Sequence, residues 1–290
     1  MNPKNNKIYK YNTTNPTMNI NKSIFLEKSN LIRRKIIRTS HKSKIPHLGS
    51  CLSCVDLLVY IYWFVLKIQI EKPDDPNRDI FILSKGHGAP ALFQVLAERG
   101  FFEEKLLETF GKQGSFFHEH PPKPGYINGV EAATGSLGHG LPMAAGMALA
   151  KKIKGLKSRC FVLLSDGECN EGSIWESAML GSSLKLDNLY VFIDYNKWQA
   201  TGRSQEIMAL EPLAEKWKSF GWEVDEIDGH DFNSIDKAYK KSKSKLHKPK
   251  IIICHTTKGK GVSFMEDDNN WHYRIPNEKE LNAALSELEN

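Results

Sequence analysis

The chain alternates short apolar runs with longer segments in which apolar residues recur at helical spacing. The apolar runs are rich in β-branched and aromatic residues and end at polar turns, which predicts strands. Strands are predicted at Asp79 to Ser84, Cys160 to Leu164, Asn188 to Asp194, Trp222 to Ile227 and Lys250 to His255. Helices are predicted at Ser23 to His41, Ser53 to Ile68, Ala89 to Arg99, Glu103 to Phe110, Gly138 to Lys152 and Gly172 to Lys185, with a final helix opened by Pro276-Asn277-Glu278. This alternation is typical of an α/β fold, a doubly wound and mostly parallel sheet sandwiched by helices.

The segment from Cys160 to Gln199 forms one strand, helix, strand unit with a polar turn after each strand. The first turn contains Asp166 and the second contains Asn196. In a parallel sheet both turns lie at the same edge, so the two side chains can converge. Hard oxygen ligands beside loop amides and a helix start suit Mg²⁺ or Ca²⁺ carrying a diphosphate. Each turn taken alone is also explained by a helix cap or a simple strand end.

An acidic-glycine turn, a helix and an apolar strand ending in Asp-x-Asn resemble the thiamine diphosphate (ThDP) motif. The flanks, Asn170-Glu171-Gly172-Ser173-Ile174-Trp175-Glu176 and Lys185-Leu186-Asp187-Asn188-Leu189, are similar to transketolase. Over roughly residues 25 to 290, the chain resembles the N-terminal half of a transketolase or the N-terminal subunit of a split one. The resemblance implies that the side chains of Asp166 and Asn196 and the backbone carbonyl of Trp198 bind the metal. It also implies that Gly167 and Glu168 lie at the cofactor.

Three further loops match the same family. Ser84-Lys85-Gly86-His87-Gly88 implies contacts of Lys85 and His87 with cofactor or substrate. The loop from Glu131 to Gly140 is similar to the one that cradles the diphosphate, which implies cofactor contacts for Gly135, Ser136, Leu137 and His139. The Thr257 to Gly261 loop and Trp271-His272 imply that Lys258 and His272 lie near cofactor and donor substrate.

Four histidines are the expected catalytic set: His47, His87, His120 and His272. Neutral imidazoles near their usual pKa suit proton transfer to sugar hydroxyls and hydrogen bonding to a carbonyl oxygen. His120 is preferred to His118 because Pro121 follows it, as in the family's Gly-His-Pro. Surface or core positions are expected for the histidines without such context, which are His41, His230 and His247.

The chain also departs from the family pattern at several positions. The family usually has glycine at Ser165, another small polar residue at Tyr195 and glutamine at His139. Ile45-Pro46 replace the usual Ser-Gly before the first histidine, and Glu119 replaces glycine before His120. The last three departures favour a specialised acceptor, such as a branched or nucleotide-linked sugar.

Composition limits the other functions. The formal charge of +6 gathers in Lys237 to Lys250 and in the N-terminal tail, without the aromatic residues that nucleic-acid binding would add, so no nucleic-acid partner is expected. The longest apolar run, Leu57 to Leu66, is too short to span a bilayer, and no membrane association is expected. Residues 1–22, rich in Asn and Lys, predict a disordered tail before one domain at 23–290.

The five cysteines, without a secretory signal, favour reduced thiols in the cytoplasm. Cys51 and Cys54 have the spacing of a metal knuckle but no second pair, so core packing is the expectation.

The family resemblance implies that the cofactor lies between this domain and a pyrimidine-binding domain, for which no segment after Lys258 is long enough. The expected partner is therefore a C-terminal transketolase subunit, in an α₂β₂ assembly, and no activity is expected without it. Two alternatives stay open: the α-subunit of another ThDP enzyme, such as a 2-oxo acid dehydrogenase, and a non-catalytic protein with the same fold.

Overall fold

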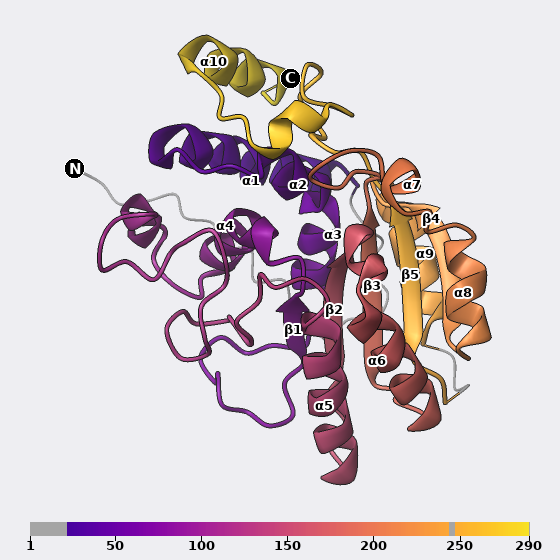
Figure 1. Ribbon diagram of the computed structural model, residues 1–290. Helices are drawn as coiled ribbons and strands as arrows, with labels where there is room; N and C mark the ends of the chain where they lie inside the picture. Colours follow the sequence, from indigo (N-terminus) through magenta and orange to yellow (C-terminus); the bar gives the residue numbers. More distant parts are fainter. Residues whose placement is uncertain (1–21, 244–246, 290) are drawn as a thin grey trace.

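The computed structural model of the chain describes residues 22–243 and 247–289 (Figure 1). The expected disordered tail lies outside the described residues except for Lys22, which begins the first helix. The strands are β1 (Ile80–Leu83), β2 (Cys160–Ser165), β3 (Leu189–Tyr195), β4 (Glu223–Asp228) and β5 (Lys250–His255). The α-helices are α1 (Lys22–Ser43), α2 (Leu48–Ser53), α3 (Val55–Tyr60), α4 (Ala89–Arg99), α5 (Gly140–Ile153), α6 (Gly172–Ser183), α7 (Ser204–Ile207), α8 (Leu213–Ser219), α9 (Phe232–Lys241) and α10 (Glu278–Glu287). A π-helical turn, η1 (Ile61–Val65), and the 3₁₀ turns η2 (Gly86–Gly88), η3 (Glu104–Thr109), η4 (Gly167–Asn170) and η5 (Asn269–His272) complete the chain.

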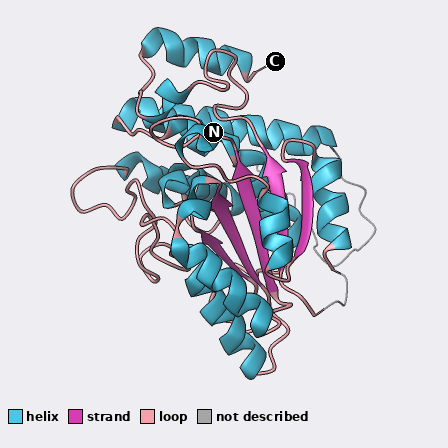
Figure 2. Ribbon diagram, turned by 45° about the vertical axis from the view of Figure 1, so that its right-hand side comes forward, coloured by secondary structure: helices cyan, strands magenta, loops and turns pink. Residues whose placement is uncertain are grey.

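The five strands form one parallel sheet in the order β1-β2-β3-β5-β4 (Figure 2). In the register of the central strands, Leu163 lies between Leu83 and Phe192. Every residue of β3 is buried, as expected for a strand covered on both faces. The edge strand β4 is only partly buried and carries acidic residues, which keep an exposed strand edge from pairing with another chain. The predicted strands and the parallel sheet are confirmed.

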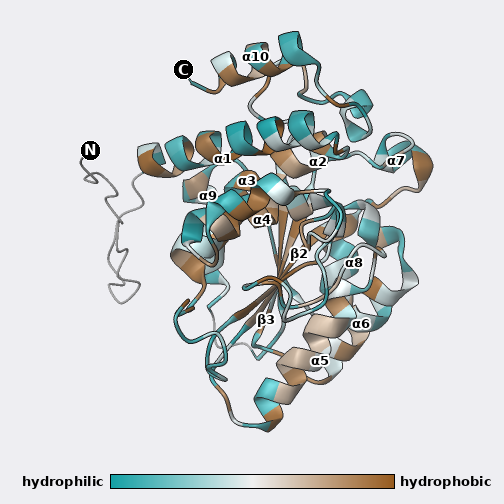
Figure 3. Cartoon of the chain, turned by 90° about the vertical axis from the view of Figure 1, so that its left-hand side faces the viewer, coloured by the Kyte–Doolittle hydropathy of each residue, from teal (hydrophilic) through white to brown (hydrophobic). Residues whose placement is uncertain are grey.

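Helices cover both faces of the sheet. Leu141 of α5, Ile174 of α6 and Trp217 of α8 belong to one apolar cluster with Val191 of β3. The other face packs against α1, α3, α4 and α9, and Phe192 faces that second cluster. Figure 3 shows the brown, apolar strands at the centre, with helices of mixed teal, white and brown around them. The sheet is therefore wound on both faces, as the sequence predicts.

The chain reverses direction at one place in the sheet. From β3 it passes over the position of β5 to β4, with α8 on one face, and returns through α9 on the other face to β5. The loops that follow the neighbouring strands β3 and β5 therefore lie side by side at the carboxyl edge of the sheet, at the point where the strand order reverses. Open α/β sheets bind their ligands at such points.

One predicted helix is wrong in its extent and continuity. Instead of one helix from Ser53 to Ile68, the structure has α2, a break at Cys54, α3, and the π-helical turn that ends at Val65. Beside the break, the hydroxyl of Ser53 donates to Asp194 at 2.6 Å, a tertiary contact that the local helical pattern does not predict.

Smaller differences concern short elements. The predicted Glu103 to Phe110 helix is the 3₁₀ turn η3. The apolar pattern does not predict α7 and α8, which are too short to show a clear helical period. Ser165 ends β2 in extended backbone, so the serine causes no strain at this position, where the family usually has glycine.

Candidate active site

The turns after β2 and β3 meet at the carboxyl edge of the sheet. Asp166 is fully buried, and its carboxylate accepts the Lys197 amide at 2.9 Å and the Ser204 hydroxyl at 2.8 Å. Its other oxygen accepts the Gly167 amide at 3.0 Å. The expected convergence of the two turns is therefore present, and Ser204 is an anchor that the sequence analysis missed.

Asn196 lies in the second turn, with its side chain buried. Its amide group approaches the Ser53 hydroxyl at 3.4 Å, and its carbonyl oxygen accepts the Trp198 amide at 3.1 Å. Lys197 between them adopts a left-handed conformation with φ of 70°, which turns the chain back toward Asp166. Trp198, whose carbonyl is the predicted third ligand, follows directly.

The environment of Asp166 fits a bound cation. Burial raises the pKa of its carboxyl to about 7, and the described residues place no lysine, arginine or histidine in an ion pair with it. A carboxylate, an amide oxygen and a backbone carbonyl are hard oxygen donors of the kind that Mg²⁺ and Ca²⁺ bind. No group of three or more His, Cys, Asp and Glu side chains suited to a metal occurs in the described ranges, but the predicted set includes only one such residue.

Glu168 supports this turn from within the fold. It is fully buried, and its carboxylate accepts the Ser84 hydroxyl, the Ser165 amide at 2.9 Å and the Gly138 amide at 3.1 Å. Burial raises its pKa. Because these bonds use its oxygens, Glu168 holds the β1, β2 and 131–140 loops together.

The predicted diphosphate loop, Glu131 to Gly140, contacts both the loop after β1 and the ring of His120. A β-carbon on Gly86 would lie 2.5 Å from the Gly135 amide nitrogen, and one on Gly135 would lie 2.6 Å from the His120 ring. Only glycine permits these approaches. Leu137 is half-buried, whereas Ser136 and His139 are exposed.

A buried carboxylate, Asp194, joins the ends of three strands. It forms an ion pair with Lys85 after β1 and accepts hydrogen bonds from Ser53 and from Thr256 after β5. The Lys85 ammonium also donates to the Ser50 carbonyl at 2.9 Å. The structure therefore gives Lys85 a structural partner that the sequence analysis missed. The signal was present, since an acidic residue near the end of a buried strand requires a partner.

The four predicted histidines form one cluster, called here the histidine cluster: His47, His87, His120 and His272. Ring centroids lie 4.6 Å apart for His47 and His87, 4.9 Å for His47 and His272, and 4.5 Å for His87 and His120. They come from four separate segments. The amide of His47 donates to the His272 carbonyl at 2.6 Å, which fixes two of these segments to each other.

Burial lowers the pKa of three cluster imidazoles. The pKa of His47 and of His87 falls to about 4 and that of His272 to about 3, mainly by desolvation and then by nearby imidazoles and lysines. These rings are therefore neutral at pH 7, as expected, but the expectation of pKa values near the usual one is wrong, because the rings are partly desolvated. A neutral imidazole has one nitrogen that donates and one that accepts, so the cluster can hold and pass protons.

Lys258 joins the cluster from the loop after β5. Its ammonium donates to Asn269 at 2.5 Å and lies 3.1 Å from His272 Nδ1. Burial lowers its pKa to about 8. It therefore contacts the histidine cluster, as the family resemblance implies.

His230 supports the Lys258 loop, although the sequence analysis expected no role for it. One ring nitrogen lies 2.7 Å from Asp56, which also pairs with Arg33 at 2.7 Å. The other accepts the Thr257 amide at 2.9 Å. No sequence signal points to this relay, because its members come from α1, α3, the β4–α9 loop and the β5 loop.

The remaining histidines and the cysteines lie outside the cluster. His118 is exposed, His41 bonds the Pro276 carbonyl, and the exposed His247 pairs with Asp187. All five cysteines are free and buried, which confirms core packing for Cys51 and Cys54. None of the described helices has the length and apolar character needed to cross a bilayer.

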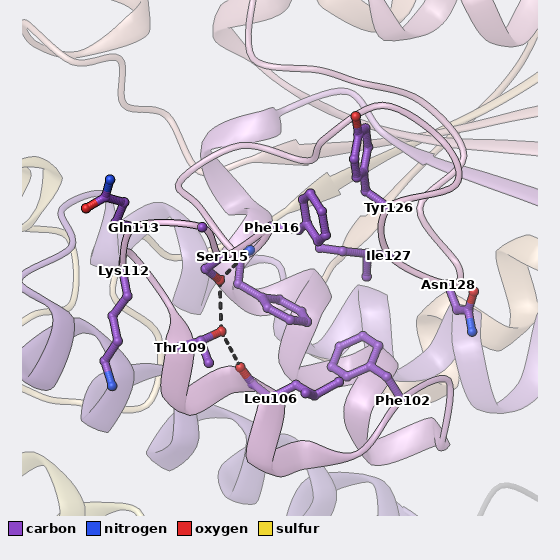
Figure 4. Close-up of a pocket in the computed structure, with 12 residues that line it drawn as sticks. Phe102, Leu106, Thr109, Lys112, Gln113, Ser115, Phe116, Tyr126, Ile127 and Asn128 are labelled. Atoms are coloured by element: carbon purple, nitrogen blue, oxygen red, sulfur yellow. Dashed lines mark hydrogen bonds between the residues drawn. The ribbon is translucent and has the colours of Figure 1, made fainter.

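A hollow of about 490 Å³ lies away from these residues, between α4 and α5 in sequence (Figure 4). Aromatic and polar side chains line it, among them Phe102, Phe116 and Tyr126. None of the predicted site residues belongs to its lining. It is therefore separate from the histidine cluster.

A doubly wound parallel sheet with these two turns and glycine loops at its carboxyl edge defines the class of ThDP-binding α/β domains. Residues 27–288 match the family "Transketolase, thiamine diphosphate binding domain", and the chain belongs to that family.

Similar proteins cover nearly the whole chain. An apulose-4-phosphate transketolase subunit of Phocaeicola vulgatus is 38% identical over 88% of this chain and 90% of its own length. A 6-deoxy-6-sulfo-D-fructose transketolase subunit of a Clostridium species (strain MSTE9) is 41% identical over 90% of this chain and 94% of its own. The solved transketolase of Campylobacter jejuni superposes with a TM-score of 0.86 and 29% identity, over 94% of this chain and 43% of that chain.

Proposed function

We propose that this chain is the N-terminal subunit of a two-component, ThDP-dependent transketolase. It transfers a two-carbon ketol unit from a ketose or ketose phosphate to an aldose or a specialised sugar acceptor. The single observation that carries the proposal is the histidine cluster beside the buried Asp166–Asn196 turns, at one edge of one sheet. Two relatives of nearly the same length are named as transketolase subunits, which supports a divided enzyme.

In this proposal, the turns bind the charged end of the cofactor. Asp166, Asn196 and the Trp198 carbonyl would hold Mg²⁺ or Ca²⁺, and the backbone from Gly135 to Leu137 would bind the diphosphate. Gly167 and Glu168 shape the first turn, and His139 borders the loop. When bound, ThDP supplies the electron sink for cleavage and formation of a carbon–carbon bond next to a carbonyl.

The histidine cluster handles the protons. His47, His87, His120 and His272 act as general acids, general bases and hydrogen-bond donors at the sugar hydroxyls and carbonyl oxygen. Lowered pKa values keep the rings of His47, His87 and His272 neutral at pH 7, so each of these rings can accept a proton from a hydroxyl. Lys258 bonds His272, and Lys85 orders the first loop through Asp194.

The partner in this proposal is a C-terminal subunit with a pyrimidine-binding domain, in an α₂β₂ assembly in the cytoplasm. The test combines the purified chain with ThDP, Mg²⁺, xylulose 5-phosphate and an aldose acceptor, with and without that partner. We expect glycolaldehyde transfer only from the reconstituted pair. Full turnover by this chain alone would contradict the divided enzyme.

The alternative is the α-subunit of a 2-oxo acid dehydrogenase, with the same fold and cofactor. Enzymes of that type usually lack the transketolase-like histidine set. Replacing the ketose by a 2-oxo acid in the same assay separates the two functions. Absence of any ThDP-dependent thermal stabilisation of the pair would favour the non-catalytic alternative.

A further inference from the structure

Glu119 places a carboxylate at the edge of the histidine cluster. Its Oε2 atom lies 3.9 Å from Nδ1 of His47, and its side chain is 44% exposed. Within residues 22–243 and 247–289, Glu119 makes no hydrogen bond and no other ion pair. Its charge is therefore available to a molecule that enters the cluster from solvent.

His47 offers a group for such a molecule. The residue is 8% exposed, and its Nδ1 atom has no hydrogen-bond partner among the described residues. A buried polar atom without a partner is unfavourable unless a ligand or water completes it. A molecule that reaches this nitrogen also lies close to Glu119.

The two buried lysines of the site, Lys85 and Lys258, already have partners within the fold. Lys85 is paired with Asp194, and Lys258 bonds Asn269 and His272. His120, the neighbour of Glu119, stacks edge-on against His87. The segment containing Glu119 and His120 therefore brings a negative charge to the neutral ring of His47, and no cation of the described residues pairs with Glu119.

We propose that Glu119 is a specificity-determining residue that favours substrates with a neutral hydroxyl next to the reacting carbonyl and rejects those with a carboxylate there. This inference rests on the proposed two-carbon transfer, in which the reacting carbonyl lies at the imidazoles. A hydroxyl can donate a hydrogen bond to Glu119. A carboxylate at the same place is repelled by it, and the partly desolvated surroundings screen this repulsion less than water does.

Two aldehydes isolate this difference. Glycolaldehyde carries a neutral hydroxymethyl group next to the aldehyde carbon, and glyoxylate carries a carboxylate there. Each can accept the two-carbon unit from xylulose 5-phosphate. The C2–C3 bond of the donor breaks, the C3 hydroxyl gives up its proton, and carbons 3 to 5 leave as glyceraldehyde 3-phosphate. A bond then forms to the aldehyde carbon of the acceptor, whose oxygen takes up a proton. The reconstituted pair, loaded with ThDP and Mg²⁺, is assayed with each acceptor as wild type and as Glu119→Gln.

We expect Glu119→Gln to raise the ratio of kcat/KM for glyoxylate to kcat/KM for glycolaldehyde by about tenfold. The matched control is Glu108→Gln, which removes the same charge from an exposed glutamate on η3 and should leave the ratio unchanged.

Three results would contradict these expectations in distinguishable ways. An equal ratio in wild type and Glu119→Gln, with transfer to glycolaldehyde intact, would overturn the role of Glu119 and leave the proposed function standing. An equal rise in the ratio for Glu108→Gln would also overturn it, because net charge would then explain the effect. If the wild-type reconstituted pair transferred the two-carbon unit to neither acceptor, the proposed function would be overturned, and this inference with it.

Discussion

The turns around Asp166 and the histidine cluster lie at the same sheet edge but are built differently. Asp166, Glu168 and Asn196 are buried and follow neighbouring strands directly. The four histidines of the cluster come from four separate segments, and all except His47 are half-buried. The difference matches two tasks. Holding a charged group requires a fixed, desolvated frame, whereas proton transfer requires side chains that substrate can reach.

Burial shifts pKa values in opposite directions in the two regions, but in both it favours the uncharged form of the side chain. It raises the pKa of the Asp166 carboxyl to about 7 and lowers that of His87 to about 4, because it disfavours the charged form of each. The carboxylate gains its charge fully when a cation compensates it. The imidazole needs no compensation, since its neutral form is the working one.

The largest expected effect separates chemistry from binding. His87→Gln in the reconstituted pair should lower kcat by about 10²–10⁴-fold, because glutamine can hydrogen-bond but cannot carry the proton. The dissociation constant of ThDP should stay within a few-fold of wild type. His118→Gln, an exposed neighbour of the cluster segment, is the control. Equal losses of cofactor affinity and kcat would show that the two regions are not separable.

The next effect concerns the frame that both regions share. Asp194→Asn leaves the Lys85 ammonium buried without its counter-charge, which should cost about 3–5 kcal/mol of unfolding free energy. Urea unfolding of the isolated chain measures it. The double variant Lys85→Met with Asp194→Asn should lose less than the two single variants together. Strict additivity would show that the pair is not coupled.

A smaller effect is expected for the relay behind Lys258. His230→Ala removes the acceptor for the Thr257 amide and the partner of Asp56, which should cost about 1–3 kcal/mol. Thermal unfolding measures this loss. His247→Ala, at an exposed histidine, should change little. Equal effects of the two substitutions would mean that the relay does not stabilise the loop.

The smallest effect is a pH dependence from the histidine cluster. The folded pKa values of His47, His87 and His272 lie below the ordinary 6.5. Between pH 6.5 and about 4, the unfolded chain binds protons that the folded chain does not, so stability falls as pH is lowered through this window.

After a discount for solvent screening at the half-exposed rings of His87 and His272, the loss from pH 7.5 to 5 is about 1 kcal/mol, or a Tm decrease of about 2–4 °C. The variant with all three histidines replaced by glutamine should show a smaller pH-dependent decrease than wild type. A decrease of the same size in both proteins would assign the pH dependence to other groups.

The sequence was most informative where chemistry follows directly from a strand. The meeting of Asp166 and Asn196 is predicted by one strand, helix, strand unit, and β5 has the predicted bounds. The sequence was less informative where partners are distant. Lys85 and Asp194 are 109 positions apart, and no local pattern pairs them. Ser53, beside the break at Cys54, likewise contacts Asp194, which is 141 positions away.

The histidine cluster was predicted through family resemblance, since His47 and His272 lie in unrelated local patterns. Their proximity depends on a backbone hydrogen bond between two loops. Glu119 was visible only as a departure from the family. Its distance from His47 required the structure.

The most direct test of the account is a ThDP titration of the reconstituted pair in Mg²⁺, comparing wild type with Asp166→Ala and Asn196→Ala by calorimetry. Both substitutions should weaken cofactor binding by about 100-fold or more, since each removes an oxygen donor from the same cation. Unchanged affinity in either variant would contradict the claim that these two turns jointly hold the cofactor.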